Sequence, residues 1–304
     1  MFKGRLTAQI KQFYKLFIAP PKQWWLPKKS EILIYDASGS ELLAPYVFQY
    51  GVEVLAIHGE FVNIPCLLHA TLSFEFWRFK PVQAYCNAFI RAVSPKIIIT
   101  FIDNSISFYA ISGNFPEIKT IFWQNGVRGG PGDIFASIKN TEKYHVDYMF
   151  VFSQHVGKEY QRYISGEIIV AGSLKNNSRN ISTDVVDESI LFISQFREKP
   201  ASGKAFFIDV NGVDIPWEKI YLPEMLALKF LKIWCTNNKK LLRIAGCMGK
   251  VQGAEQTFFA NHLNGCNWEY VPKTEDYGSY ELLDRAEIVV GIDSTLVLES
   301  IGRG

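Results

Sequence analysis

Two series of short β-branched runs, each alternating with helical stretches, constrain this chain more than any other feature. Residues 96–102 form an almost continuous apolar run, which is typical of a strand covered on both faces of a sheet. Because strands that alternate with helices build parallel sheets, the first series predicts one such sheet. Its predicted strands are 31–36, 52–57, 96–102, 120–123, 148–152 and 167–172, with 64–68 as a further candidate and a helix over 74–93.

A second series begins beyond a polar stretch, residues 176–188, which contains neither pattern and forms a natural hinge. Its predicted strands are 189–193, 241–245, 268–271 and 287–291, and its predicted helices are 223–237, 254–263 and 277–286. Two tandem series predict an α/β fold with two Rossmann-like domains that face a cleft. The expected domains are residues 31–180 and 188–304.

Composition excludes several classes of protein. Of the 304 residues, 48% are hydrophobic and 20% are charged, which is the balance of a globular chain. The 32 basic and 30 acidic side chains give a formal charge of +2, too balanced to indicate nucleic-acid binding. No apolar run approaches the roughly 20 residues that cross a bilayer. The five cysteines are scattered without zinc-ligand spacing, which favours reduced thiols in a cytoplasmic protein and predicts no metal site.

The first thirty residues differ from the rest, because they carry seven basic side chains and no acidic one. Apolar residues recur there at helical spacing, and Trp24 and Trp25 follow a pair of prolines. This pattern predicts that residues 1–30 contact an anionic membrane surface, at the inner face of the cytoplasmic membrane. The alternative is a helix that packs across the first domain with its lysines in solvent.

Ligands of open α/β sheets bind beyond the carboxyl ends of the strands, so polar residues that follow strands are candidate site residues. Asp103 and Asn104 follow the strand at 96–102, where a carboxylate and an amide can position a hydroxyl and remove its proton. The alternative is that Asp103 or Ser105 caps the next helix.

A glycine-rich loop at residues 124–132 follows the strand at 120–123. It contains Gln124, Asn125 and Arg128, and Arg128 can hold a phosphate or carboxylate through two hydrogen bonds. The loop lacks the lysine and the spacing of a Walker motif, and a plain surface loop is the alternative.

Two further loops are candidates for the hinge and the cleft. Ser173, Lys175 and Asn176 follow the strand at 167–172, and Ser194 and Gln195 follow the first strand of the second series. Both loops also fit ordinary turn chemistry.

The segment 290–304 is the most informative. A buried strand ends in Asp293, Ser294 and Thr295, where a helix begins, so hydroxyls and unpaired backbone amides form a site suited to a phosphate. Glu299 lies about one turn further along the same helical face and can accept hydrogen bonds from the two hydroxyls of a ribose. The alternative is a capped helix start with Glu299 in solvent.

These last residues, together with Gly302, Arg303 and Gly304, resemble the nucleotide-binding edge of GT-B glycosyltransferases and of the related UDP-N-acetylglucosamine 2-epimerases. Other stretches resemble the bacterial family of surface carbohydrate biosynthesis proteins, which is associated with O-antigen and capsule assembly. Those stretches are residues 95–104, 123–128, 146–152 and 171–177, and the resemblance runs from about residue 31 to the last residue.

The resemblance implies a GT-B-type transferase that takes a sugar from a nucleotide-sugar donor and passes it to a glycan or lipid-linked acceptor. By position, Ser294 and Thr295 would bind the donor phosphates and Glu299 the ribose, with Asp293 as a further nucleotide-binding residue. Asp103 would be the catalytic carboxylate. The acceptor side would be lined by Asn104, Gln124, Asn125 and Arg128. Such enzymes generally use neither a metal nor a resident cofactor, and no Asp-x-Asp motif occurs.

One departure from the family pattern is that the chain stops at Gly304, where a GT-B second domain normally adds a strand and returning helices. The sequence therefore predicts an incomplete C-terminal domain. Two other functions stay open: a nucleotide-sugar 2-epimerase, which is an isomerase on the same fold, and a non-catalytic scaffold of the polysaccharide assembly machinery. Transfer of glycerol phosphate is a variant within the transferase class.

Overall fold

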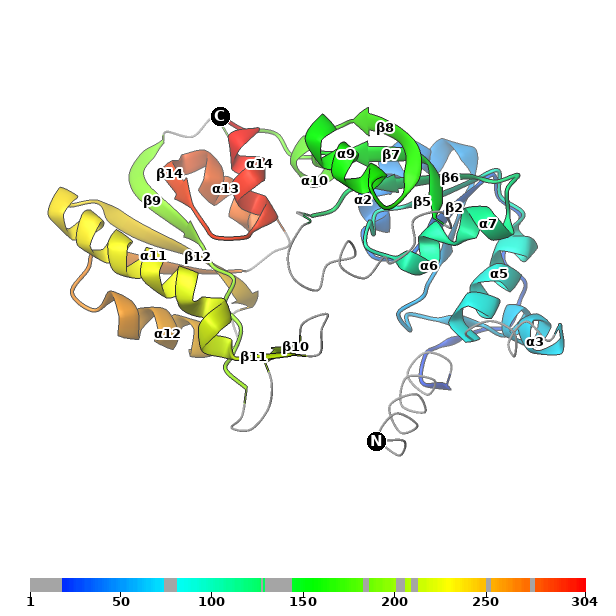
Figure 1. Cartoon of the computed structure of the whole chain (residues 1–304), viewed down its shortest axis with the longest axis horizontal. Coiled ribbons are helices and arrows are strands. Elements are labelled where there is room, and N and C mark those ends of the chain that lie inside the picture. Colours follow the sequence, from blue (N-terminus) through cyan, green and yellow to red (C-terminus); the bar gives the residue numbers. More distant parts are fainter. Residues whose placement is uncertain are drawn as a thin grey trace. The chain divides into compact units, whose positions relative to one another are not determined.

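The computed structural model describes residues 18–73, 81–126, 128, 144–182, 186–200, 206–208, 213–249, 253–273 and 277–304. The chain divides into two compact units (Figure 1). The first unit ends at Lys175, and the second unit runs from Asn176 to Gly304. This boundary lies before position 180, at which the sequence predicted the first domain to end.

The first unit is built on a six-stranded sheet in which every neighbouring pair of strands is parallel. The strand order is β3-β2-β5-β6-β7-β8, and all six predicted strands are found. Their bounds are β2 Ile32–Tyr35, β3 Val52–Leu55, β5 Ile97–Thr100, β6 Lys119–Trp123, β7 His145–Val151 and β8 Ser165–Val170. A separate parallel pair joins β1 (Lys22–Gln23) to β4 (Val62–Asn63).

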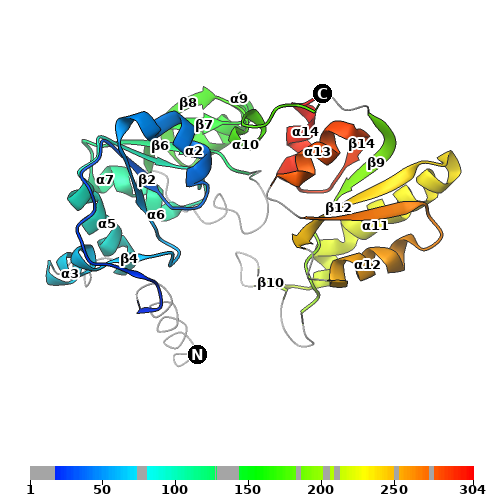
Figure 2. The same cartoon turned by 180° about the vertical axis from the view of Figure 1, so that it is seen from behind.

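Helices cover the faces of this sheet (Figure 2). The core joins Leu33 of β2 and Ile98 of β5 to the buried face of α5, including Phe89. The bounds are α2 Ser40–Val47, η2 Phe48–Tyr50, α3 Ile64–Leu72, α5 Pro81–Val93, α6 Ile106–Tyr109, α7 Ile111–Asn114, α9 Gln154–Gln161 and α10 Leu174–Asn177.

The candidate strand at 64–68 is wrong, because these residues begin α3. The side chain of Asn63 caps this helix by accepting a hydrogen bond from the backbone N–H of Cys66 at 3.1 Å. Pro65 occupies the first turn, where its missing N–H costs no helical hydrogen bond. A helix start signal therefore outweighs the short apolar run.

The second unit has a four-stranded parallel sheet in the order β13-β12-β9-β14. The bounds are β9 Asp187–Ile193, β12 Leu241–Gly249, β13 Trp268–Lys273 and β14 Ala286–Val290, and the short antiparallel pair is β10 Phe207–Ile208 with β11 Asp214–Ile215. The helices are α11 Trp217–Asn238, α12 Gly253–Leu263, α13 Gly278–Arg285 and α14 Thr295–Ile301.

Alternation along β9 builds two cores, one on each face of this sheet. Ile190 and Phe192 pack with α11 and α12, while Leu191 and Ile193 pack with α13 and α14. Figure 1 shows α11 and α12 together on one face of the sheet. The predicted Rossmann-like architecture of both domains is confirmed.

A buried ion pair closes the second unit near the end of the chain. Arg303 donates to both carboxylate oxygens of Asp284 on α13, at 2.5 and 2.6 Å. It also donates to the side chain of Asn176 and to the carbonyl of Asn180, both at 2.9 Å. Ser182 donates its N–H to Asp284 at 2.7 Å. Residues 176–182, which the sequence assigned to the hinge, therefore pack with the second unit.

Candidate functional site

In each sheet, successive strands are first added on one side of the first strand and later on its other side. Ligands of such sheets bind at this switch point, beyond the carboxyl ends of the two strands that flank it. In the first unit this point lies between β2 and β5, and in the second between β9 and β14. Each unit therefore has its own candidate half-site at the carboxyl edge of its sheet.

Asp103 lies just beyond β5 and is fully buried. Arg128 donates to both of its carboxylate oxygens, with Nε at 2.9 Å from Oδ2. Tyr160 donates its hydroxyl to the same carboxylate, and the backbone amide of Asn125 also hydrogen-bonds to it. The structure thus brings together Asp103, which was predicted as the catalytic carboxylate, and Asn125 and Arg128, two of the residues predicted for the acceptor side.

The charge of Arg128 is fixed by this contact. Burial alone would lower the pKa of the guanidinium, but the hydrogen bonds and the charge of Asp103 outweigh burial and raise it. Arg128 also donates to the Asn125 side chain at 2.7 Å. A buried carboxylate with a guanidinium in this geometry holds the residues after β6 against the end of β5.

The side chain of Gln124 links two backbone segments in this half-site. It is buried, accepts a hydrogen bond from the N–H of Phe152 at 2.9 Å, and donates to the carbonyl of Gly126 at 2.7 Å. Asn104 is exposed, beside the buried Asp103. Ser105, not Asp103, caps α6 by accepting from the N–H of Phe108 at 3.3 Å.

Sequence reasoning missed Asp36, which lies at the end of β2 beside β5. Asp36 is buried with a backbone φ of +82°, a left-handed conformation that few residues other than glycine adopt. Its carboxylate accepts from the N–H of Ser38 at 2.9 Å and lies 2.8 Å from Nε2 of His58, which follows β3. A carboxylate directly after the first strand was the signal for it.

Gly39 follows Asp36 at the same edge, and its φ is +76°. A Cβ at this position would lie 2.3 Å from Cδ1 of Phe101, so only glycine allows this close approach.

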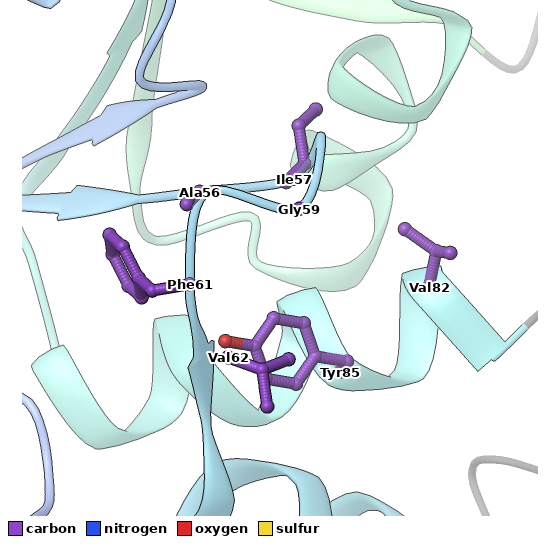
Figure 3. Close-up of a pocket in the computed structure, with 7 residues that line it drawn as sticks. All are labelled: Ala56, Ile57, Gly59, Phe61, Val62, Val82 and Tyr85. Carbon is purple, nitrogen blue, oxygen red and sulfur yellow. The ribbon is translucent and has the colours of Figure 1, made fainter. Parts of the chain in front are cut away.

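A small apolar cavity lies between the loop after β3 and helix α5 (Figure 3). Its volume is about 10 Å³, which is room for about one water molecule. It cannot hold a sugar or a nucleotide and is not part of the half-site. The lining residues are Ala56, Ile57, Gly59, Phe61, Val62, Val82 and Tyr85.

In the second unit, Ser194 follows β9 and is buried. Its hydroxyl donates to Glu255 at 2.5 Å and accepts from the N–H of Phe196 at 3.1 Å. Gln195 comes next in the same loop, and its carbonyl accepts the hydroxyl of Tyr221 at 2.7 Å. Both predicted residues therefore lie at the carboxyl edge of β9.

Glu255 organises this edge and was missed by the sequence analysis. It is fully buried and also accepts hydrogen bonds from the N–H groups of Cys247 and Met248 and from the hydroxyl of Tyr270, at 2.7 to 3.0 Å. Four donors, counting the Ser194 hydroxyl, thus converge on this one carboxylate and hold it in place. Only its position in the first turn of α12 could have suggested this role.

A second buried carboxyl, Glu224 on α11, lies close to this cluster, and its Oε1 has no hydrogen-bond partner among the described residues. Burial, and then the charge of Glu255, raise the pKa of Glu224 from its ordinary value of 4.5 to about 7. The backbone amide of Gln195 and the charge of Arg197 oppose this shift.

Glu224→Gln is expected to remove a pH dependence of stability. The folded chain holds a proton on Glu224 between pH 4.5 and about 7, where the unfolded chain releases it. The free energy of unfolding is therefore highest below pH 4.5, and it falls by about 3 kcal/mol as the pH rises to about 7. Urea denaturation at pH 5, 6, 7 and 8 should show this fall in the parent chain and a flatter profile in the variant.

The matched control is Glu188→Gln in the same unit, since its side chain is 89% exposed. This control should keep the pH slope of the parent chain. Equal slopes in Glu224→Gln and the parent chain would contradict the assignment.

The segment after β14 lies beside the end of β9, as its strand pairing requires. Asp293 is exposed, and Ser294 caps α14 by accepting the N–H of Leu296 at 3.3 Å. Thr295 is half-buried at the start of the helix. At Gly291, a Cβ would lie 2.5 Å from Cγ2 of Val297, so glycine allows the tight turn from strand to helix.

Glu299 is buried, in contrast to the alternative in which it lies in solvent. Tyr280 of α13 donates its hydroxyl to the carboxylate at 2.6 Å. Burial of the phenol, then the charge of Glu299, raise the pKa of Tyr280. The structure thus fixes Glu299 on the α13 side of its helix.

The three residues predicted at the hinge lie on either side of the unit boundary. Ser173 and Lys175 belong to the first unit, and the Lys175 ammonium lies 5.5 Å from the ring centre of Phe101. Asn176 belongs to the second unit, where its side chain accepts from Arg303.

Part of the predicted membrane-contact segment is described. Trp24, Trp25 and Leu26 are 67, 86 and 67% exposed, and Lys28 and Lys29 are exposed beside them. Residues 1–17, which carry the expected amphipathic helix, lie outside the described residues. No helix in the described ranges combines the length and the apolar character that crossing a membrane requires.

In those same ranges, His, Cys, Asp and Glu side chains do not gather in groups of three that could hold a metal ion.

Comparisons with known proteins agree with this architecture. Residues 121–304 match the family described as "putative O-antigen biosynthesis protein". No curated protein matches the chain in sequence. Among solved structures, a "putative UDP-N-acetylglucosamine 2-epimerase" from Listeria monocytogenes is similar at 11% identity and a TM-score of 0.50, over 94% of this chain and 78% of that one.

Two further structures show a weaker likeness. The UDP-GlcNAc 2-epimerase of Neisseria meningitidis bound to UDP-GlcNAc has 10% identity and a TM-score of 0.45, over 86% of this chain and 76% of that one. MurG of Acinetobacter baumannii has 10% identity and a TM-score of 0.45, over 90% of this chain and 75% of that one.

The Listeria likeness shows the fold, in agreement with the GT-B-like architecture that the sequence predicted. The family match shows the setting, since it covers more than half of the chain. The protein therefore belongs to the family of O-antigen biosynthesis proteins and has a role in carbohydrate biosynthesis.

Proposed function

We propose that this protein transfers a sugar from a nucleotide-activated donor to a glycan or lipid-linked acceptor during assembly of a bacterial surface polysaccharide. Family membership supports the setting. The observation that carries the proposal is the strand order of the second unit, in which β9 and β14 are neighbours. Two polar loops, at Ser194–Gln195 and at Asp293–Thr295, therefore meet at the edge where such sheets bind ligands.

In this proposal the second unit holds the donor. The hydroxyls of Ser294 and Thr295 take part in binding the phosphates, and the tight turn at Gly291 keeps α14 close to the sheet edge. Glu299 contacts the ribose, and the hydroxyl of Tyr280 positions its carboxylate. The buried Glu255 supports the donor side indirectly, because it fixes Ser194 and the end of β12.

The first unit contributes the acceptor side, with Asn104, Gln124, Asn125 and Arg128. The catalytic role expected for Asp103 stays a prediction. Its carboxylate already accepts from Arg128, Tyr160 and the Asn125 amide, which favours a positioning role in which Asp103 orients Arg128. Contact of residues 1–30 with a membrane, which would bring the enzyme to a lipid-linked acceptor, is part of the proposal. The exposed Trp24 and Trp25 support it.

Isothermal titration of the full chain with UDP-, GDP-, CDP- and CMP-sugars tests the donor site. We expect binding to one of them, weakened about tenfold or more by Thr295→Val, because a hydrogen bond to a charged phosphate is lost. The matched control is Thr236→Val on α11, whose exposed hydroxyl donates to the carbonyl of Lys232 one turn earlier in the same helix. Absence of binding to all four donor classes would overturn the proposal.

Binding of a nucleotide sugar is expected of both a transferase and an epimerase, so a second measurement distinguishes the two reactions. Conversion of a bound nucleotide sugar to its 2-epimer without any acceptor would replace the transferase by an isomerase. Release of nucleotide that depends on an added glycan or lipid-linked acceptor is the result that the transferase proposal expects.

A further inference from the structure

Helix α11 carries a continuous apolar ridge on the side that faces away from its sheet. The residues that face the sheet are buried, among them Leu228, Leu231 and Cys235. On the opposite side, Leu222, Leu226, Phe230 and Ile233 are 49, 58, 64 and 55% exposed. We call these four residues the α11 ridge.

The spacing of the α11 ridge is four, four and three residues, which puts its members on one helical face. At about 1.5 Å per residue the ridge extends about 16 Å along the helix. Single exposed apolar residues are common on protein surfaces, but a continuous stripe marks a surface that another body covers.

The charges around the ridge are positive. Lys219 and Lys229 are exposed and Lys232 is half-buried, and none of the three forms an ion pair with a described residue. Of the two acidic residues of α11, Glu218 is paired with Lys199 and Glu224 is buried. The adjacent α12 has Glu255 as its acidic residue, and that side chain is fully buried.

We propose that the α11 ridge docks on a lipid bilayer whose surface carries anionic headgroups. The four apolar side chains enter the boundary between headgroups and acyl chains, and the lysine ammonium groups remain at the headgroup level. Charge selects this occupant over a second copy of the chain, because a second copy would bring the same uncompensated lysines together. The surface is separate from residues 1–30, and its argument does not use the transfer reaction.

Co-sedimentation of the full chain with vesicles tests this surface. The vesicles contain phosphatidylcholine with or without phosphatidylglycerol, and every protein also carries Trp24→Gln and Trp25→Gln, so that binding through those side chains is removed. We expect binding to the anionic vesicles only. Leu226→Gln with Phe230→Gln should lower the partition coefficient about tenfold or more, since two apolar side chains no longer enter the bilayer.

Charge is tested in the same assay. Lys219→Glu with Lys229→Glu should lower binding about tenfold or more in low salt, and the difference should shrink in high salt. The matched control is Phe48→Gln with Leu72→Gln in the first unit, because both side chains are 77% exposed and lie outside the α11 ridge. That control should bind like its parent. Circular dichroism verifies that all of these surface variants are folded.

Three results would overturn the proposal. One is the absence of binding to anionic vesicles, and another is unchanged binding by the α11 ridge variant. The third is a change of oligomeric state in light scattering on ridge substitution, without a change in vesicle binding, which would assign the ridge to a second copy of the chain.

Discussion

Arg303→Ala is expected to lower the free energy of unfolding of the second unit by about 3–5 kcal/mol, although the residue is the penultimate one of the chain. The Arg303 and Asp284 side chains are 4 and 2% exposed. Removing the guanidinium leaves a buried carboxylate without its counter-ion and also releases Asn176 and the carbonyl of Asn180. Urea denaturation at neutral pH measures the loss.

The neighbouring Arg285→Ala is the matched control, because that side chain is exposed on the same helix as Asp284. Its effect should stay within about 0.5 kcal/mol. Arg303→Lys should fall between the two, since lysine keeps the charge but not the two-pronged hydrogen bonding. A loss below about 1 kcal/mol in Arg303→Ala would contradict the assignment of a buried, energetically coupled pair.

Asp103→Ala is expected to cost the first unit about 3–5 kcal/mol, because Arg128 would remain largely buried without its carboxylate. The guanidinium side chain is only 12% exposed, and its partner is fully buried. Tyr160 would lose the acceptor of its hydroxyl at the same time. Urea denaturation of the variant against the parent chain measures the effect.

A double variant separates this pair from a plain packing defect. Asp103→Leu with Arg128→Met replaces both charges by apolar side chains, so it should cost less than the sum of the two single substitutions. Additive losses would show that the two residues act independently. Such a result would also remove the positioning role proposed for Asp103.

The strands were largely predictable from local pattern. The apolar run that became β5 indicated a strand covered on both faces, and β5 does lie inside the sheet with its end buried. The apolar run at 64–68 predicted a strand but forms the start of α3, because an asparagine cap and a proline in the first turn specify a helix. Short apolar runs fit both structures, and only the flanking residues decide between them.

Asp103, Arg128, Glu299 and Ser194 were all recognisable as candidates, since each follows a strand or lies on the first turns of the next helix. Their partners were not recognisable. Asp103 is bonded by Arg128, which lies 25 positions away in the sequence, and by Tyr160, which lies 57 positions away. No local pattern encodes such pairings, because they arise from strand order and helix packing.

Glu224 and Glu255 show the limit most clearly. In sequence they are acidic residues on helices, which are usually exposed to solvent. In the structure both are buried under the loop that follows β9, one satisfied by four donors and the other with an oxygen that has no partner among the described residues.

The amino-acid sequence by itself determined the two alternating series, the class of fold and the loops in which polar residues gather, because these depend on local periodicity and turn chemistry. Tertiary structure alone decided which strands are neighbours, which carboxyls are buried, and which apolar side chains of α11 remain uncovered. The physical reason is that burial and charge pairing depend on contacts between segments far apart in the chain, and those contacts exist only once the sheets have formed.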